Sequence, residues 1–186
     1  QKFWVKGNTR VAGAYHFYNG SVGSSLTGAR GYGISVSGEK PNQLFSITSG
    51  LNFDFASGRA KFNDGGSVRS SSFSLLSASV FVGLKLFVIP VASSPLRPFV
   101  GASGIFGVGD LQLGSSSLSS LQKTYVASQA GYYLSAGLDV IFSAPTQGKA
   151  GSILFFVTQM SNVRGAMAGN SAFSTASFKL ILGVGW

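Results

Sequence analysis

Hydrophobic residues alternate with small or polar residues along most of this chain. Because successive side chains of a β-strand point to opposite faces, such alternation predicts strands with one apolar face and one polar face. The last nine residues show the pattern clearly, since Lys179, Gly183 and Gly185 share one face and large apolar side chains share the other. The members of that apolar face are Phe178, Leu180, Leu182, Val184 and Trp186.

Counting faces in this way along the whole chain predicts eight strands. Their expected ranges are about 2–18, 29–38, 44–57, 72–89, 98–109, 125–142, 151–162 and 178–186. In the first strand, Arg10 and His16 are expected on the inward face. The segment 151–162 is apolar on both faces, so the pattern does not orient it.

The prolines divide the predicted strands into four hairpins. Proline has no backbone N–H to donate, so it favours turns and strand ends. The prolines fall at three places along the chain, which predict three short turns, and the Gly- and Ser-rich segments between them predict four longer loops. These prolines are Pro41, Pro90, Pro95, Pro98 and Pro145.

The composition favours a membrane-embedded sheet. Charged residues make up only 10% of the 186 residues, whereas soluble domains carry roughly 25%. No apolar run reaches the ~18 residues of a transmembrane helix. Since every backbone polar group must be paired inside lipid, the remaining solution is a closed barrel. We therefore predict one all-β domain over 1–186, an eight-stranded antiparallel transmembrane β-barrel. A soluble β-sandwich would need charged outward faces, and the strands at 72–89, 125–142 and 178–186 lack them.

Aromatic residues near the ends of the predicted strands are expected to form belts at the two membrane interfaces. These residues are Tyr15, Phe17, Phe55, Phe73, Phe142 and Trp186.

The segment from Arg97 to Gly104 reads Arg-Pro-Phe-Val-Gly-Ala-Ser-Gly. It resembles the Pro-aromatic-Val-Gly-Ala-x-Gly strand of small bacterial outer-membrane barrels of the OmpA, OmpW and opacity-protein type. The terminal aromatic Trp186 resembles their C-terminal assembly signal, although Phe is commoner there. The resemblance implies a monomeric barrel in the outer membrane of a Gram-negative envelope. It also implies folding by the barrel-assembly machinery, periplasmic proline-containing turns and longer outer loops.

Four charged residues are expected to point into the barrel lumen: Asp54, Lys85, Asp139 and Lys179. A charged side chain facing lipid near the midplane costs roughly 2–4 kcal/mol, and buried charges need partners. Lys85 and Asp139 fall near the same end of their strands, which favours a pair across the lumen. Such charges either form a salt-bridge plug or form the selectivity constriction of a narrow pore.

Basic residues in the loop predicted at 58–71 are candidates for contact with lipopolysaccharide phosphates. They are Arg59, Lys61 and Arg69, and the chain as a whole has a formal net charge of +9. Arg and Lys bind phosphate well, and a solvated basic loop is the alternative. Nucleic acid is not an expected partner, because the basic residues are scattered singly. In the Leu-rich segment 110–124, exposed leucines would mark a protein contact or cap the barrel mouth.

The sequence offers little catalytic chemistry. His16, the single histidine, is followed by Phe17 and Tyr18 rather than the His-x-Ser of lipid-modifying barrel enzymes. There is no cysteine, and the carboxylates have no metal-ligand spacing. We expect no enzyme activity, cofactor or metal. The expected function is a structural or interaction role as an accessory or anchoring subunit of an envelope complex. Its expected neighbours are outer-membrane lipid, lipopolysaccharide and other envelope proteins. The alternatives are a small pore for small or hydrophobic solutes and a lipid-modifying barrel enzyme.

Overall fold

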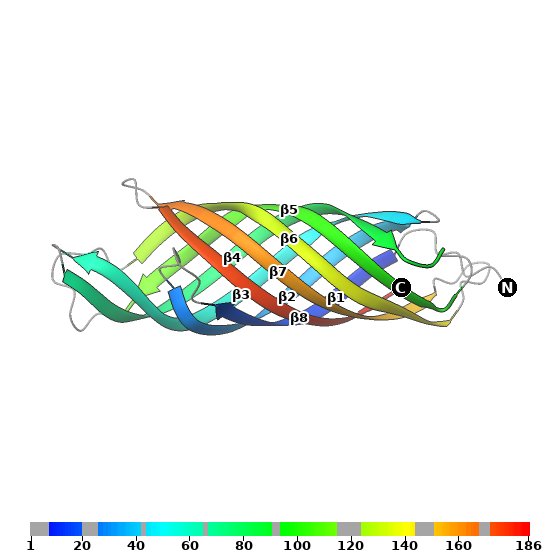
Figure 1. Ribbon diagram of the computed structural model, residues 1–186, viewed down its shortest axis with the longest axis horizontal. Coiled ribbons are helices and arrows are strands. Elements are labelled where there is room, and N and C mark those ends of the chain that lie inside the picture. Colours follow the sequence, from blue (N-terminus) through cyan, green and yellow to red (C-terminus); the bar gives the residue numbers. More distant parts are fainter. Residues whose placement is uncertain are drawn as a thin grey trace.

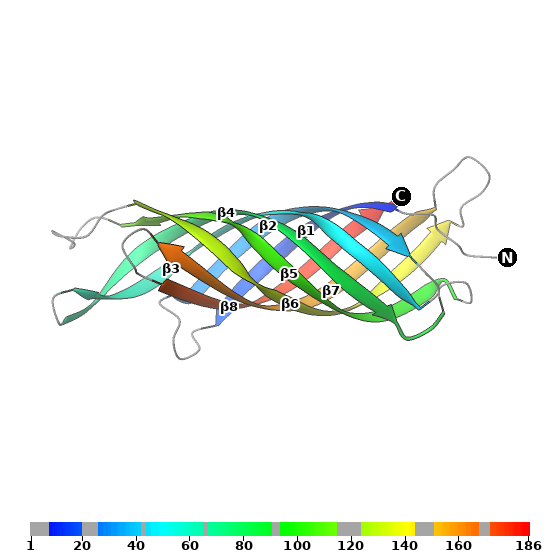
Figure 2. The same cartoon turned by 90° about the horizontal axis from the view of Figure 1, so that it is seen from above.

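The eight predicted strands close into one barrel. The computed structural model describes residues 8–19, 26–41, 44–64, 67–90, 94–114, 124–143, 151–167 and 172–186. The strands are β1 Asn8–Asn19, β2 Leu26–Pro41, β3 Phe45–Asp64, β4 Ser67–Phe87, β5 Leu96–Leu113, β6 Thr124–Ser143, β7 Ser152–Met167 and β8 Ala172–Gly185. Each strand pairs antiparallel with its neighbour in the chain, and β1 pairs with β8 to complete the ring. Figures 1 and 2 show steeply tilted strands, and the start of β1 and the end of β8 lie at the same end of the barrel.

Among the residues that the structure describes, no helix is long and apolar enough to cross a membrane.

The outward faces agree with the face counting. Large apolar side chains are exposed on the wall of every strand, while the charged side chains of Arg10, Glu39, Asp54, Lys85, Arg97, Asp139 and Lys179 are buried inside. The structure also orients β7, which the pattern left open. Ile153 and Phe155 of β7 are buried in the lumen, whereas Phe156 and Met160 are exposed. The inner apolar face of this strand therefore fills the barrel rather than facing lipid.

One aromatic residue was assigned to the wrong face. Phe73 was expected in the outer aromatic belt, but its side chain is only 4% exposed. In β4 the outward positions are even-numbered, as Leu76 and Val80 show, so Phe73 belongs to the inner face. The position of Phe73 near the predicted strand end does not show which face it occupies, whereas its odd number in the strand does.

The prediction of a loop at 58–71 is also wrong. β3 continues to Asp64 and β4 begins at Ser67, so the segment is a paired hairpin with an unbroken register from Gly58↔Phe73 to Asp64↔Ser67. The Leu-rich segment 110–124 is partly strand as well, because β5 reaches Leu113 and Leu111 is buried. The leucines at 118 and 121 lie outside the described residues, as does the part of the first predicted strand that precedes Asn8.

Apolar side chains fill much of the lumen between the charged groups. Three buried clusters are present in the described part of the chain: Ile141 with Ile153; Phe87 with Phe99 and Val157; and Ile105 with Tyr133, Val163 and Phe81. An eight-stranded barrel is just wide enough to be filled in this way.

Candidate functional site

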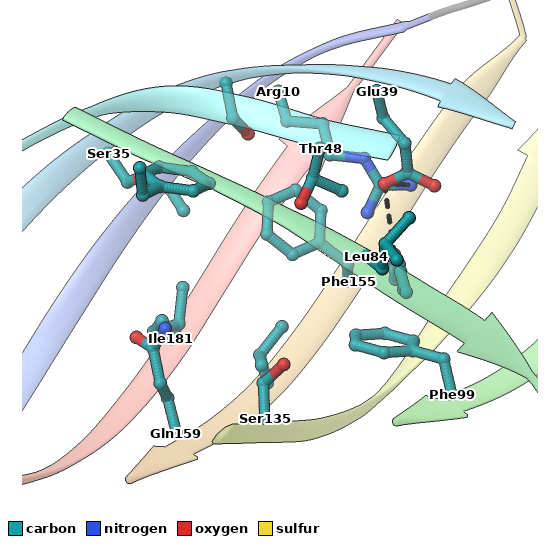
Figure 3. Close-up of a pocket in the computed structure, with 15 residues that line it drawn as sticks. Arg10, Ser35, Glu39, Thr48, Leu84, Phe99, Ser135, Phe155, Gln159 and Ile181 are labelled. Atoms are coloured by element: carbon teal, nitrogen blue, oxygen red, sulfur yellow. Dashed lines mark hydrogen bonds and ion pairs between the residues drawn. The ribbon is translucent and has the colours of Figure 1, made fainter. Parts of the chain in front are cut away.

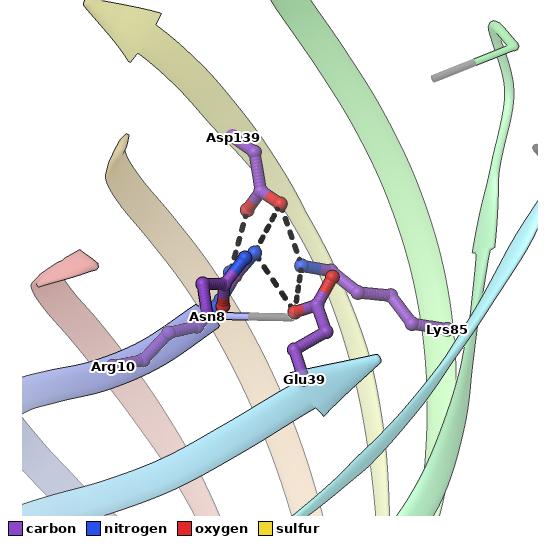
Figure 4. A network of polar contacts seen from close by, with 5 residues as sticks. All are labelled: Asn8, Arg10, Glu39, Lys85 and Asp139. Atoms are coloured by element: carbon purple, nitrogen blue, oxygen red, sulfur yellow. Dashed lines mark hydrogen bonds and ion pairs between the residues drawn. The ribbon is translucent and has the colours of Figure 1, made fainter. Parts of the chain in front are cut away.

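The first group of charges lies in the lumen near the chain ends. We name it the terminal network, and its members are Asn8, Arg10, Glu39, Lys85 and Asp139 (Figure 4). They come from the inner faces of β1, β2, β4 and β6, so they meet across the barrel rather than along one wall. All five side chains are buried.

Two cations and two carboxylates alternate in the terminal network. Arg10 donates to both oxygens of Asp139, at 3.0 and 2.8 Å, and its Nη2 lies 2.8 Å from Glu39 Oε2. Lys85 donates to Asp139 at 2.8 Å and to Glu39 at 3.1 Å. Each carboxylate therefore contacts both cations, which is the pairing that buried charges require.

Aromatic rings surround the same cations. The ammonium nitrogen of Lys85 lies 3.8 Å from the centroid of the Phe99 ring, and the guanidinium carbon of Arg10 lies 4.9 Å from that of Phe155. These are favourable cation–π distances. Arg97, the register partner of Asp139 on β5, is buried beside the network. Together these groups occupy the lumen near its terminal end.

The second group of charges lies further along the lumen. We name it the central network, and it consists of His16, Asp54 and Lys179. His16 Nε2 lies 2.9 Å from Asp54 Oδ1, and Lys179 donates to Asp54 Oδ2 at 2.8 Å. Lys179 also lies 5.1 Å from the centroid of the Tyr133 ring.

The structure places all four predicted lumenal charges inside the barrel but divides them between the two networks. Lys85 contacts Asp139 in the terminal network, and Lys179 contacts Asp54 in the central one. Sequence reasoning missed Glu39, because the second strand was predicted to end at 38. Ser35 and Ser37 face inward, and every second residue of a strand faces the same way. Extending the predicted strand by one residue would therefore have placed Glu39 on the inner face.

A cavity of about 100 Å³ lies beside the terminal network (Figure 3). Arg10, Glu39 and Lys85 line it together with Phe99 and Phe155. Hydroxyl and amide groups of Ser35, Ser37, Thr48, Ser135 and Gln159 also line it, and the apolar side chains of Ala12, Phe81, Leu84, Val157 and Ile181 complete the lining. The space exceeds the ~15 Å³ that one water molecule needs, and its lining is mostly apolar. The described residues contain no cluster of three or more His, Cys, Asp or Glu that could hold a metal ion.

The basic residues predicted to contact lipopolysaccharide lie on the β3–β4 hairpin. Arg59 is exposed on the outward face of β3, and the side chains of Lys61 and Arg69 lie outside the described part of the structure. Arg30 of the neighbouring strand β2 is also exposed and was not predicted. Both arginines lie near exposed aromatic residues, Tyr32 on β2 and Phe55 on β3, whose rings stack with centroids 6.0 Å apart.

The apolar face of the terminal strand is oriented toward the outside of the barrel. Phe178 and Leu180 are half-buried there, and Leu182, Val184 and Trp186 are exposed. Lys179 on the opposite face is buried in the lumen.

A closed antiparallel barrel, an apolar outer wall and charges paired inside define the class of protein. This chain is a membrane-spanning β-barrel of the small outer-membrane type.

Comparison with known proteins supports the fold. No family model and no curated protein matches the sequence. The structure is similar to Neisserial surface protein A, with a TM-score of 0.59 and 15% sequence identity over 97% of this chain and 96% of that one. A major outer membrane protein from Thermus thermophilus gives a TM-score of 0.42 at 15% identity, covering 97% of this chain and 98% of that one. Ail, the attachment invasion locus protein of Yersinia pestis, was solved with the heparin analogue sucrose octasulfate. It gives a TM-score of 0.36 at 16% identity, covering 97% of each chain.

Proposed function

We propose that this chain is a structural or interaction component of the bacterial outer membrane, without enzyme activity and with a lumen that does not conduct ions. It would act as an anchoring or accessory subunit of an envelope protein complex. The observation that carries the proposal is the terminal network, in which Arg10 and Lys85 are each shared between Glu39 and Asp139. Cations held by carboxylates and by aromatic rings form a plug, because moving any of them leaves an unpaired charge.

The burial of His16 supports a role without catalysis. Its side chain is 0% exposed, and its Nε2 faces Asp54. A general base must come within hydrogen-bond reach of a substrate proton, and a histidine with no exposed surface is poorly placed for that.

The proposed partners are lipid, lipopolysaccharide and other envelope proteins, with the barrel-assembly machinery acting during folding. Arg30 and Arg59 support the lipopolysaccharide contact, since they lie beyond the exposed rings of Tyr32 and Phe55. Aromatic rings favour the membrane interface, so the guanidinium groups would lie at the level of the lipid phosphates. The outer wall of Val, Leu and Phe suits lipid or the wall of a partner protein.

A small pore is the second candidate, and the cavity of about 100 Å³ favours it. The purified barrel should be refolded into planar bilayers and its conductance recorded, beside the variant Lys85→Met. We expect no discrete channels from either protein. Channels whose conductance changes in Lys85→Met would contradict a closed lumen and make the terminal network a constriction.

The subunit role has its own test. The native protein should be extracted in mild detergent and its copurifying molecules identified. Partner proteins in stoichiometric amounts would support an envelope complex. A single barrel that carries only lipid would contradict it and leave a stand-alone structural protein.

A further inference from the structure

The barrel is closed by the pairing of its first and last strands. We name this pairing the seam, and its register runs from Arg10↔Gly185 to Asn19↔Ala176. Two further backbone hydrogen bonds join Thr9 and Trp186, at 2.9 and 3.0 Å. Every other pair of neighbouring strands is also adjacent in the chain. The seam alone joins segments that are far apart in the sequence, so it carries the largest loop-closure cost.

The two basic members of the central network lie opposite each other on this seam. His16 of β1 and Lys179 of β8 are register partners, and both are buried on the inner face. Cross-strand partners have their Cβ atoms about 4.5–5.5 Å apart, so the imidazole of His16 and the ammonium group of Lys179 enter the lumen next to each other. If the pair is to support the seam, the buried ammonium group of Lys179 needs a carboxylate partner, and the buried imidazole of His16 needs a hydrogen-bond partner.

Asp54 supplies that carboxylate from outside the seam. It belongs to β3, which is separated from β1 by β2. One of its oxygens lies 2.9 Å from His16 Nε2, and the other accepts from Lys179 at 2.8 Å. A single side chain thus contacts both strands of the seam.

Glycine in β2 makes this crossing possible. Gly33 is the register partner of Asp54, and it lies on the inner face of the strand between Asp54 and the seam. A Cβ atom at Gly33 would overlap Oδ1 of Asp54, the oxygen that contacts His16. The next inward position toward the far end is Gly31, the register partner of His16. The two missing side chains leave the inner surface of β2 open where the carboxylate passes.

We propose that Asp54 is a latch that holds the seam closed by binding both members of the His16/Lys179 pair, and that Gly33 provides its passage across β2. The latch forms only when the first and last strands have met, because its two partners come from opposite ends of the chain. The terminal network differs in this respect. Its ion pairs reach β1 through Arg10, but none of them reaches β8 among the residues that the structure describes.

The test is hydrogen–deuterium exchange of the full chain, folded in detergent micelles, resolved by strand. Asp54→Asn keeps the shape of the side chain but removes its charge. We expect the amides of β1 and β8 to exchange roughly ten times faster than in the unmodified protein, or more. The β5–β6 ladder should change little, because only the seam loses the carboxylate that neutralises Lys179. The double variant Asp54→Asn/Lys179→Met should recover most of the seam protection, since the unpaired cation is then absent.

Gly33→Ala tests the latch with every charge retained and remains informative if Asp54→Asn does not fold. The new methyl group should displace the carboxylate and give the same seam-selective exchange. Gly38→Ala is the matched control, because this glycine lies on the same strand, faces outward and has open space around its Cβ position. Unchanged seam exchange in Gly33→Ala, or equal acceleration of the β5–β6 ladder, would overturn the proposal. No recovery in the double variant would also do so.

Discussion

At the scale of single residues, Lys85 is a buried cation that depends on several partners at once. Its ammonium group contacts Glu39 and Asp139 and lies over the Phe99 ring. Removing one partner of a buried ion pair is costly, because the remaining charges lose their compensation. In this case Glu39 and Asp139 would lose one of the two cations that they share.

We therefore expect Lys85→Met to lower the free energy of unfolding by about 3 kcal/mol. Denaturant titration of the barrel in lipid vesicles measures it. The control is Lys40→Met, because Lys40 is exposed on the outer face of β2, where a substitution changes stability by less than about 0.5 kcal/mol. Equal effects of the two substitutions would mean that the terminal network contributes no more than a surface charge.

The sequence predicts which residues enter the lumen better than it predicts what they contact. Parity alone places Asp54, Lys85, Asp139 and Lys179 inside, because a lipid-facing charge is so unfavourable. It does not show that Asp54 reaches across β2, since this depends on the absence of a side chain at Gly33 and on the tilt of the strands. Glu39 was missed because it lies one residue beyond the predicted end of its strand.

At the scale of elements, the β3–β4 hairpin extends beyond the rest of the barrel. Figure 1 shows it reaching furthest from the chain ends. β2 pairs with β3 only as far as Ala60, and the register of β5 with β4 starts at Phe73. In the ladders described, residues 61–64 and 67–70 thus pair only with each other. Among the residues that the structure describes, the outer part of this hairpin therefore adds no strand pairing to the barrel wall.

Deleting residues 61–64 together with 67–70 should leave the barrel intact. The deletion removes four cross-strand pairs and keeps the glycines at 65 and 66 to connect Ala60 with its partner Ser71. Two-residue Gly-Gly connections suit tight hairpins. We expect the free energy of unfolding to change by less than about 1 kcal/mol, because surface hairpin tips tolerate such changes. Folding is measured by gel electrophoresis in SDS, in which a folded barrel changes its mobility when it is heated. A shortened chain that does not refold into this form would show that the hairpin contributes to closing the barrel.

The ends of this hairpin were hard to predict for a physical reason. Residues 58–71 are rich in Gly, Ser, Asn and Asp, which are depleted from strands and enriched in turns. Their pairing depends on the partner strand rather than on their own preference. The strand faces were easier, because lipid and lumen impose opposite polarity on alternate positions.

At the scale of the whole molecule, the outer wall defines the membrane-embedded zone. The outward apolar positions of β4 run from Leu76 to Leu86. That length matches the roughly 9–11 residues that a tilted strand needs to cross a bilayer. Val82 lies near the middle of this zone, whereas Leu96 begins β5 at its terminal edge.

Arginine substitutions on the outer wall should therefore show how deep in the bilayer each position lies. We expect Val82→Arg to lower the free energy of unfolding in lipid vesicles by roughly 2–4 kcal/mol and Leu96→Arg by roughly 0–1 kcal/mol. Both residues are exposed on the outer wall, so a difference in burial within the protein would not explain a difference between the two variants. Similar values for the two variants would contradict the assigned zone.

The closed ring of eight strands also sets the sidedness of the protein. An even number of crossings returns the chain to the face from which it started, and the start of β1 lies beside the end of β8 at one end of the barrel. An epitope or reporter domain joined to the chain before β1 would therefore lie in the same compartment as one joined after β8. One inserted at the hairpin end between Asp64 and Ser67 would lie in the opposite compartment. The barrel can thus present a partner domain on each side of the membrane without any change to its wall.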